Sequence, residues 1–302
     1  MYCKGGECMS ELTELANYKL KKESRLLNFL KQLMHNKVAF LSLVFLLIVH
    51  IIVFLGPLFW KVSPEAIDPA NQLAPWSLEH PLGTDNLGRD VFSRMISGGQ
   101  VTLLVGFSAM IFTVLIGGLV GVLAGYFGGW IDAVLMRFTE AMLSIPNFFL
   151  ALVALTVLGK SPMIVVLVIA FTTWMEIARV VYGETLKWKE SEFVEVSHAM
   201  GAGPLRILGK HVIPQIIPSI IVSSTLGIAW AILTESAISY LGLGIQPPTA
   251  TWGNMLQDAQ QYIWTSPILG VLPGLAITLV VLSYNFLGDG LRDLLDPKHL
   301  KK

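Results

Sequence analysis

Long apolar runs separated by short polar segments dominate this chain. A helix that crosses a lipid bilayer needs about 20 consecutive, mostly apolar residues. Six runs reach this length, and their approximate bounds are Val38–Phe59, Val101–Gly125, Phe138–Leu158, Pro162–Tyr182, Pro214–Leu243 and Pro267–Leu287. The pattern therefore predicts an all-α membrane protein, with a polar tail over residues 1–37 and six transmembrane helices within residues 38–302.

The composition agrees with this prediction and excludes several classes of function. The chain of 302 residues is 54% hydrophobic and only 14% charged, whereas a soluble domain carries about 25% charged residues. Its formal net charge is zero, which gives no electrostatic reason to expect nucleic-acid binding. The two cysteines, Cys3 and Cys8, lack the paired spacing of a zinc site. Because the sequence shows no nucleophile–histidine–acid set and no cluster of metal ligands, we expect no catalytic site, no cofactor and no bound metal.

The positive charges fall mostly on one side of the predicted membrane. Lys and Arg residues concentrate in loops that face the cytoplasm. If the N-terminus is cytoplasmic, the outer segments hold only Lys61, Arg89, Arg94 and Lys160, and the other Lys and Arg residues lie inside. We therefore expect both termini, and the polar loop between the fourth and fifth spans, to lie in the cytoplasm.

That loop, at about residues 183–213, contains the stretch SEFVEVSHAMGAGPLRILGKHVIP. A helix over Glu190–Met200 is expected to end at Gly201, since glycine readily adopts the left-handed conformation of a helix cap. Pro204 fits the first turn of a second helix, where its missing N–H is not needed. Acidic and basic residues are equally prominent, so a helix–turn–helix lying on membrane lipid and one that docks another protein fit equally well.

The loop resembles the EAA loop on the cytoplasmic side of permease subunits of bacterial ABC importers. Glu195 and Gly201 match the anchor positions of that pattern, and Pro214 matches its closing proline. Val196 and Ser197 stand where the pattern usually has alanine. The resemblance implies that an ATPase subunit contacts this loop at Glu195, Ser197, Ala199, Gly201, Ala202, Gly203, Pro204 and Pro214.

Three further stretches resemble the second permease of dipeptide, oligopeptide and nickel importers. They are HPLGTDNLGRDVFSRMISGGQVTL (His80–Leu103), SYLGLGIQPPTATWG (Ser239–Gly253) and NFLGDGLRDLLDP (Asn285–Pro297). The resemblance implies the fold of a type I ABC importer permease in the bacterial cytoplasmic (inner) membrane. It also implies a pore formed with a second permease subunit. Two cytoplasmic ATPase subunits would dock on this pore, and an extracytoplasmic substrate-binding protein would deliver the cargo.

The same resemblance implies peptides as the cargo, with nickel or a metal chelate (metallophore) as the alternative. The stretch DAQQYIWTSP (Asp258–Pro267) is similar to the nickel branch, so both cargo classes stay open. An ion-coupled carrier that works alone would show inverted repeats and paired charges near the membrane centre, and neither is evident in the sequence. A membrane scaffold without a transport role is compatible with the glycine-rich spans, but the subfamily signatures argue against it.

One stretch comes close to a nucleotide-binding motif. ALTVLGKS (Ala154–Ser161) differs from the phosphate-loop pattern G-x-x-x-x-G-K-[ST] only at its first position. That motif requires a strand before it and a helix after it, whereas this copy ends an apolar span. We therefore expect no ATP site here, and separate ATPase subunits must supply the energy for transport.

Several ionisable residues lie in or near the predicted spans. Glu235 falls near the outer edge of the fifth span. It is either a carboxylate bonded to nearby hydroxyls, which we favour, or a residue of the transport pathway. Glu176 and Arg179, at the inner end of the fourth span, have the spacing of a helical ion pair.

The segment before the second span carries two acid–base pairs at helical spacing. These pairs are Asp85–Arg89 and Asp90–Arg94, and their order favours a helix. Thr84 or Asp85 would cap it. We therefore expect a capped surface helix here.

Glycines and prolines predict how some spans pack and bend. A glycine face formed by Gly117, Gly121, Gly125 and Gly129 would let another helix approach span two closely. Pro146 allows a kink in the third span.

Overall fold

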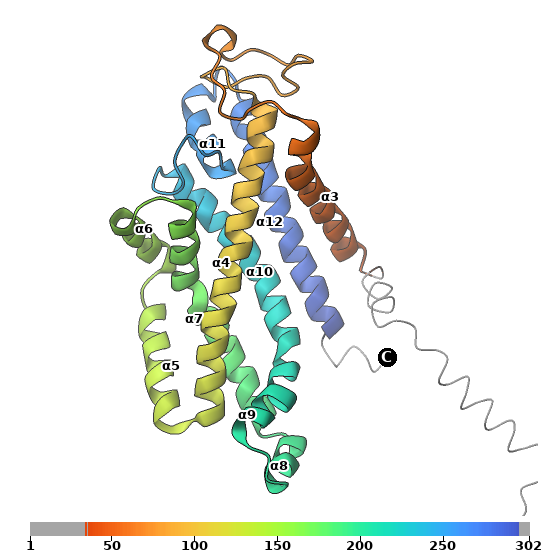
Figure 1. Cartoon of the computed structure of the whole chain (residues 1–302), viewed down its shortest axis with the longest axis vertical. Helices are drawn as coiled ribbons and strands as arrows, with labels where there is room; N and C mark the ends of the chain where they lie inside the picture. Colours follow the sequence, from red (N-terminus) through yellow and green to blue (C-terminus); the bar gives the residue numbers. More distant parts are fainter. Residues whose placement is uncertain (1–33, 35, 296–302) are drawn as a thin grey trace, which may run out of the picture.

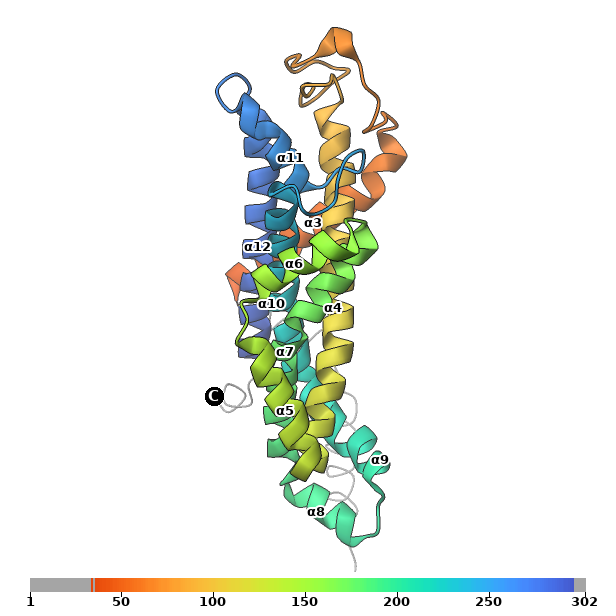
Figure 2. The same ribbon diagram turned by 90° about the vertical axis from the view of Figure 1, so that its left-hand side faces the viewer.

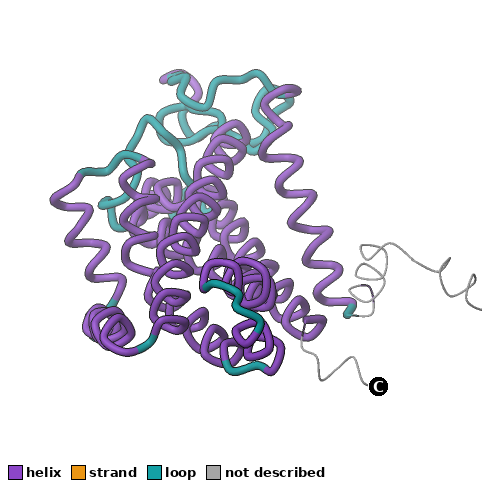
Figure 3. The backbone as a smooth tube through the Cα atoms, turned by 60° about the horizontal axis from the view of Figure 1, so that its bottom comes forward, coloured by secondary structure: helices purple, strands orange, loops and turns teal. Residues whose placement is uncertain are grey.

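The computed structural model describes residues 34 and 36–295, so Cys3, Cys8 and most of the predicted polar tail lie outside the described residues. Within that part the chain is nearly all helical, and its only β pairing is one isolated bridge between Thr84 and Asp90. Figure 3 accordingly shows only helices and connecting loops in the described part of the chain. The predicted all-α fold is confirmed.

The helices form one elongated bundle (Figure 1). Their bounds are α3 (Lys37–Phe59), α4 (Val91–Phe127), α5 (Gly129–Leu143), α6 (Asn147–Leu158), α7 (Pro162–Lys189), α8 (Glu192–Ala199), α9 (Pro204–Ile207), α10 (Ile213–Tyr240), α11 (Trp252–Ala259) and α12 (Ile268–Leu295). Five of these elements, taking α9 and α10 together, are long and apolar enough to cross a membrane. The bent pair α5 and α6 makes the sixth candidate span.

The two ends of the bundle differ in what they carry. Helices α8 and α9 lie at one end, whereas α11 and the long loop between α3 and α4 lie at the other (Figures 1 and 2). Helix α10 packs against α4, α7 and α12, and α12 packs in turn against α3. We call these the α8–α9 end and the α11 end.

The third predicted span is broken rather than kinked. Helices α5 and α6 meet at an angle of 86°, and Pro146 is the N-cap residue of α6. Proline has no N–H and disfavours the helical conformation of the residue before it, so α5 ends at Leu143. The bend at Pro146 was expected, but it is sharper than a kink in a single helix.

The glycine face of α4 packs against α7 within the same chain. A Cβ atom added at Gly117 would lie 2.5 Å from the carbonyl oxygen of Trp174, and one at Gly121 would lie 2.5 Å from that of Ala178. Only glycine permits this close approach, so the predicted packing face is confirmed. Gly129 is not part of it, because this residue begins α5 with φ +58°.

Candidate functional site

The turn between α8 and α9 ends one helix and begins another through a small set of backbone contacts. Gly201 has φ +79°, its N–H donates to His198 O at 2.9 Å, and the N–H of Ala202 donates to Ser197 O at 3.0 Å. These bonds define a Schellman motif, a common C-terminal helix cap. Pro204 begins α9. The predicted helix–turn–helix is therefore confirmed, with α8 starting two residues later than expected.

The tip of this turn is open to the surroundings. Met200 is 81% exposed and Leu205 is 83% exposed. A Cβ atom added at Gly201 or Gly203 would meet nothing within 4 Å. Exposed apolar side chains beside bare backbone form a surface that another protein can approach closely.

The structure brings most of the predicted coupling residues together around the turn. Glu195, Ala199, Gly201, Gly203 and Pro204 are exposed, and Ser197 and Ala202 are half-buried. The Ser197 hydroxyl donates to Phe193 O at 2.7 Å within α8, so it is already bonded. Pro214 is not part of this cluster, because it lies in the first turn of α10.

Buried side chains attach the turn to the bundle. Val194, Ile207 and Val212 have exposed fractions of at most 1%, and they share one apolar cluster with Tyr126 of α4 and Val181 of α7. A π-helical segment, Leu208–Val212, joins α9 to α10. Because close-packed side chains transmit displacement, a force on the turn would reach three spanning helices.

Glu235 lies near the α11 end, in α10, and is fully buried. Its carboxylate accepts hydrogen bonds from Ser239 at 2.8 Å and from Ser236 at 3.4 Å. The hydroxyls of Thr102 and Thr251 lie near the carboxylate as well. The carboxylate is thus bonded to two hydroxyls, both of them expected from sequence spacing.

The hydroxyls around Glu235 also hold the loop between α10 and α11. Each of Ser239, Thr102 and Thr251 accepts one backbone N–H, so its own proton is free to point at the carboxylate. The N–H donors belong to Ile245, Trp252 and Asn254, respectively. Glu235 is therefore linked to the backbone of the α10–α11 loop through the hydroxyl of Ser239.

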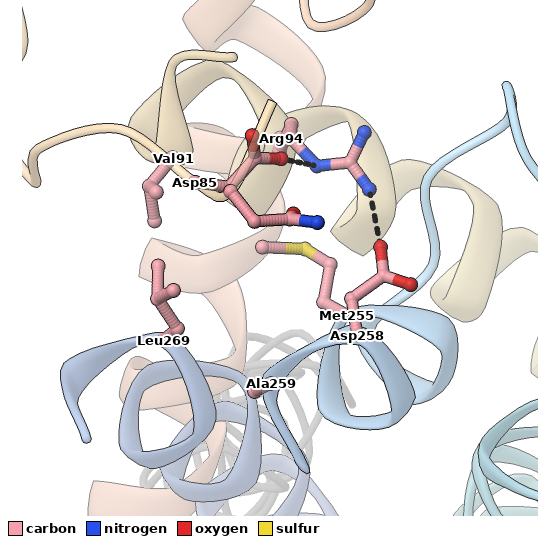
Figure 4. Close-up of a pocket in the computed structure, with 8 residues that line it drawn as sticks. Asp85, Val91, Arg94, Met255, Asp258, Ala259 and Leu269 are labelled. Atoms are coloured by element: carbon pink, nitrogen blue, oxygen red, sulfur yellow. Dashed lines mark ion pairs between the residues drawn. The ribbon is translucent and has the colours of Figure 1, made fainter. Parts of the chain in front are cut away.

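A buried ion cluster joins the segment before α4 to α11 (Figure 4). Arg89 Nε lies 2.6 Å from Asp85 Oδ2, and Arg94 Nε lies 3.4 Å from the same atom. Both arginines also reach Asp258 Oδ2, at 3.3 Å and 3.6 Å. Beside them is a cavity of about 20 Å³, and Arg94 Nη1 is buried without a partner among the described residues.

The expected surface helix over this segment is wrong. Asp90, rather than Thr84 or Asp85, caps the following helix by accepting the N–H of Ser93 at 2.8 Å. Asp90 also accepts from His80 and Trp60, so it does not pair with Arg94. The Asp85–Arg89 pair forms at the predicted spacing, but in a loop rather than a helix, and Arg94 pairs with Asp85 and Asp258 instead of Asp90.

The stretch that resembles a phosphate-binding loop has no such role in this fold. The stretch contains the last residues of α6, which ends at Leu158. A helix therefore stands where the motif requires a strand. The Lys160 ammonium donates to Gly242 O at 2.7 Å. This lysine therefore ties two loops at the α11 end together.

Comparison with protein families identifies two matching regions. Residues 117–301 match the family described as the binding-protein-dependent transport system inner membrane component. Residues 24–75 match the N-terminal transmembrane domain of oligopeptide transport permease C. The first match spans more than half of the chain.

Curated relatives align with most of the chain. A dipeptide transport system permease protein, DppC of Alkalihalophilus pseudofirmus, is 39% identical, and the alignment covers 89% of this chain and 88% of the relative. A glutathione transport system permease protein, GsiD of Pectobacterium atrosepticum, is 40% identical with 74% of each chain covered. An oligopeptide transport system permease protein, OppC of Haemophilus influenzae, is 36% identical, with coverage of 89% and 87%.

Solved structures support the same fold. A chain of the MetNI methionine ABC transporter in an inward-facing conformation aligns with a TM-score of 0.55 at 20% identity, covering 67% of this chain and 96% of that chain. A second crystal form of that transporter gives a TM-score of 0.52. This chain belongs to the family of inner-membrane components of binding-protein-dependent transport systems, as a multi-pass subunit of an ABC importer rather than an enzyme.

Proposed function

We propose that this chain forms half of the translocation pore of an ATP-driven importer of di- and oligopeptides. The relatives named for dipeptide and oligopeptide transport support this cargo over nickel or a metallophore. A second permease subunit would complete the pore, and a substrate-binding protein would deliver the cargo from outside. The α11 end would face that protein, and the α8–α9 end would face the cytoplasm.

The exposed turn between α8 and α9 is the observation that carries this proposal. It presents bare backbone and two apolar side chains at its tip, while its buried side contacts α4, α7 and α10. We assign it as the contact for one of two ATPase subunits, the other docking on the second permease. Closure of the ATPases would then move these helices as a unit.

Uptake by cells that lack only this chain tests the cargo. Labelled short peptides and labelled nickel should be compared, with and without a metal chelator. We expect peptide uptake to fall and nickel uptake to persist. Loss of nickel uptake alone would assign the chain to the metal branch instead.

Two substitutions in the turn test the ATPase contact. Glu195→Lys reverses an exposed charge, and Gly201→Asp places a charged side chain on the bare tip. Both variants should insert normally into the membrane but lose the ATPase during purification of the complex. Normal co-purification with both variants would refute the assignment.

For Glu235 we propose a structural role as an anchor of the α10–α11 loop. The carboxylate has no exposed surface, and its partners are hydroxyls that bind the loop backbone. A side chain of the pathway would instead need contact with water or cargo.

A further inference from the structure

A groove of mixed lining, called the polar groove below for the five polar side chains in it, lies partway along the bundle between α4, α7, α10 and α12. Its volume is about 400 Å³, which falls within the range of about 300–1,000 Å³ typical of ligand pockets. The polar side chains that line it are Thr113, Thr173, Glu176, Ser223 and Asn285. Trp230, 54% exposed, adds an aromatic face.

A second groove of the same chain has the opposite character. It lies between α4, α5, α6 and α7, has a volume of about 640 Å³, and is lined almost wholly by apolar residues such as Phe112 and Phe171. Its one hydroxyl, that of Thr172, donates to the backbone of its own helix. The second groove therefore suits lipid chains or an apolar protein surface, whereas the first also offers polar partners.

The polar groove lies well away from the ends of α4 and α7, both of which are candidate membrane spans. Glu176 is 13 residues before Lys189, the end of α7, which places it about 20 Å from that end of the helix. Thr113 is 14 residues before the end of α4 at Phe127, a similar depth. Helix α7 continues past the predicted end of the fourth span at Tyr182 to Lys189, so Glu176 lies farther from the end of its helix than expected.

Glu176 has no charge partner in the described part of the chain. Its expected ion pair with Arg179 is not formed. Among the described residues, the ion pairs between side chains three positions apart on a helix are Arg137–Glu140 and Lys187–Glu184. Among the described residues, the side chains of Ser223 and Asn285 likewise make no hydrogen bond, whereas Thr113 bonds to Thr173 at 3.0 Å. Ionisable residues within spanning helices face water-filled cavities or binding partners rather than lipid. These groups must therefore find their partners outside this chain.

We propose that this groove is part of the cargo pathway, and that Glu176 receives a positively charged side chain of the peptide, such as the ammonium group of a lysine. This inference rests on the proposed function. A carboxylate forms a charge-assisted hydrogen bond with an ammonium group. The Asn285 amide and the Ser223 hydroxyl can donate to, and accept from, the amide groups of a peptide. Trp230 offers a face for an apolar or cationic side chain.

Cysteine accessibility tests the pathway without reference to the cargo. In a background with Cys3→Ser and Cys8→Ser, Glu176→Cys is compared with Phe171→Cys in the complete transporter, in native membranes. The probe is a hydrophilic, cationic methanethiosulfonate. We expect modification about tenfold faster at position 176, since the reactive thiolate forms in water and not in an apolar groove.

Phe171→Cys is a matched control because it lies on the same helix, is exposed in this chain, and lines the apolar groove. Equal rates at the two positions would overturn the proposal. Protection of Glu176→Cys by the second permease alone, without cargo, would also overturn it, because the groove would then be a subunit interface.

Charge preference tests the role of the carboxylate with a variant that keeps its shape. Glu176→Gln is compared with Glu190→Gln, an exposed position at the end of the same helix. Transport of a lysine-containing and a glutamate-containing peptide is measured with saturating, preloaded binding protein. We expect Glu176→Gln to lower the ratio of the two rates by about tenfold, and Glu190→Gln to leave it unchanged.

The same ratio in both variants would overturn the role of Glu176. Failure of the wild-type transporter to carry any peptide would refute the proposed cargo instead. The accessibility result would still stand, so the two proposals fail in distinguishable ways.

Discussion

Gly201→Ala isolates the contribution of the left-handed turn to ATPase binding. The added methyl group meets nothing within 4 Å, so it causes no clash. Its cost is conformational, because Gly201 has φ +79° and the left-handed conformation costs an L-residue about 1–2 kcal/mol. If the ATPase recognises this conformation, its affinity should fall by a factor of about 5–30.

The assay is titration of purified ATPase subunit onto the permease pair in lipid nanodiscs. Gly209→Ala is the matched control, since it lies in the same loop, is exposed, also has open space at Cβ, and has no left-handed φ. Its affinity should stay within about twofold of wild type, as for most surface substitutions. Equal affinities for the two variants would refute the reasoning, because the left-handed turn would then not be what the ATPase binds.

Other substitutions test the packing and the buried polar groups. Gly121→Val should destabilise the purified protein by about 1–3 kcal/mol through overpacking against α7, whereas Gly118→Val, with nothing within 4 Å, should leave its thermal unfolding temperature unchanged. Glu235→Gln should keep substantial peptide uptake, since an amide oxygen still accepts from the surrounding hydroxyls; complete loss with normal assembly would place this residue in the pathway. Arg94→Met should cost about 1.5–3 kcal/mol, the contribution of hydrogen bonds to charged groups, because Asp85 and Asp258 lose one of their two arginine partners, and adding Asp258→Asn should recover part of that loss in the same thermal assay.

Features that depend on local sequence were predictable. Apolar length located the spans, because the bilayer sets the number of residues that a helix needs. Gly201 and Pro204 located the turn, because each has a conformational preference that acts within a few residues. The glycine spacing on α4 predicted close packing for the same reason.

Features that depend on distant segments were not predictable in the same way. Asp258 joins Arg89 across 169 residues of sequence, and no spacing rule connects them. Of the two charge pairs at helical spacing near the start of α4, only Asp85–Arg89 forms, because Arg94 is drawn to Asp85 and to Asp258 of α11. Glu176 was placed at the end of a span because the polar residues after Tyr182 suggested a loop, whereas they continue α7.

Helix α4 connects the two ends of the molecule as a single rod. Its 37 residues span about 55 Å, with Arg94 of the ion cluster near one end and Tyr126, beneath the α8–α9 turn, near the other. A rod of this length acts as a lever, since a tilt of about 10° about one end displaces the other by about 10 Å. A small adjustment of the ion cluster at the α11 end would therefore become a large displacement at the turn, and the reverse would hold for a force on the turn.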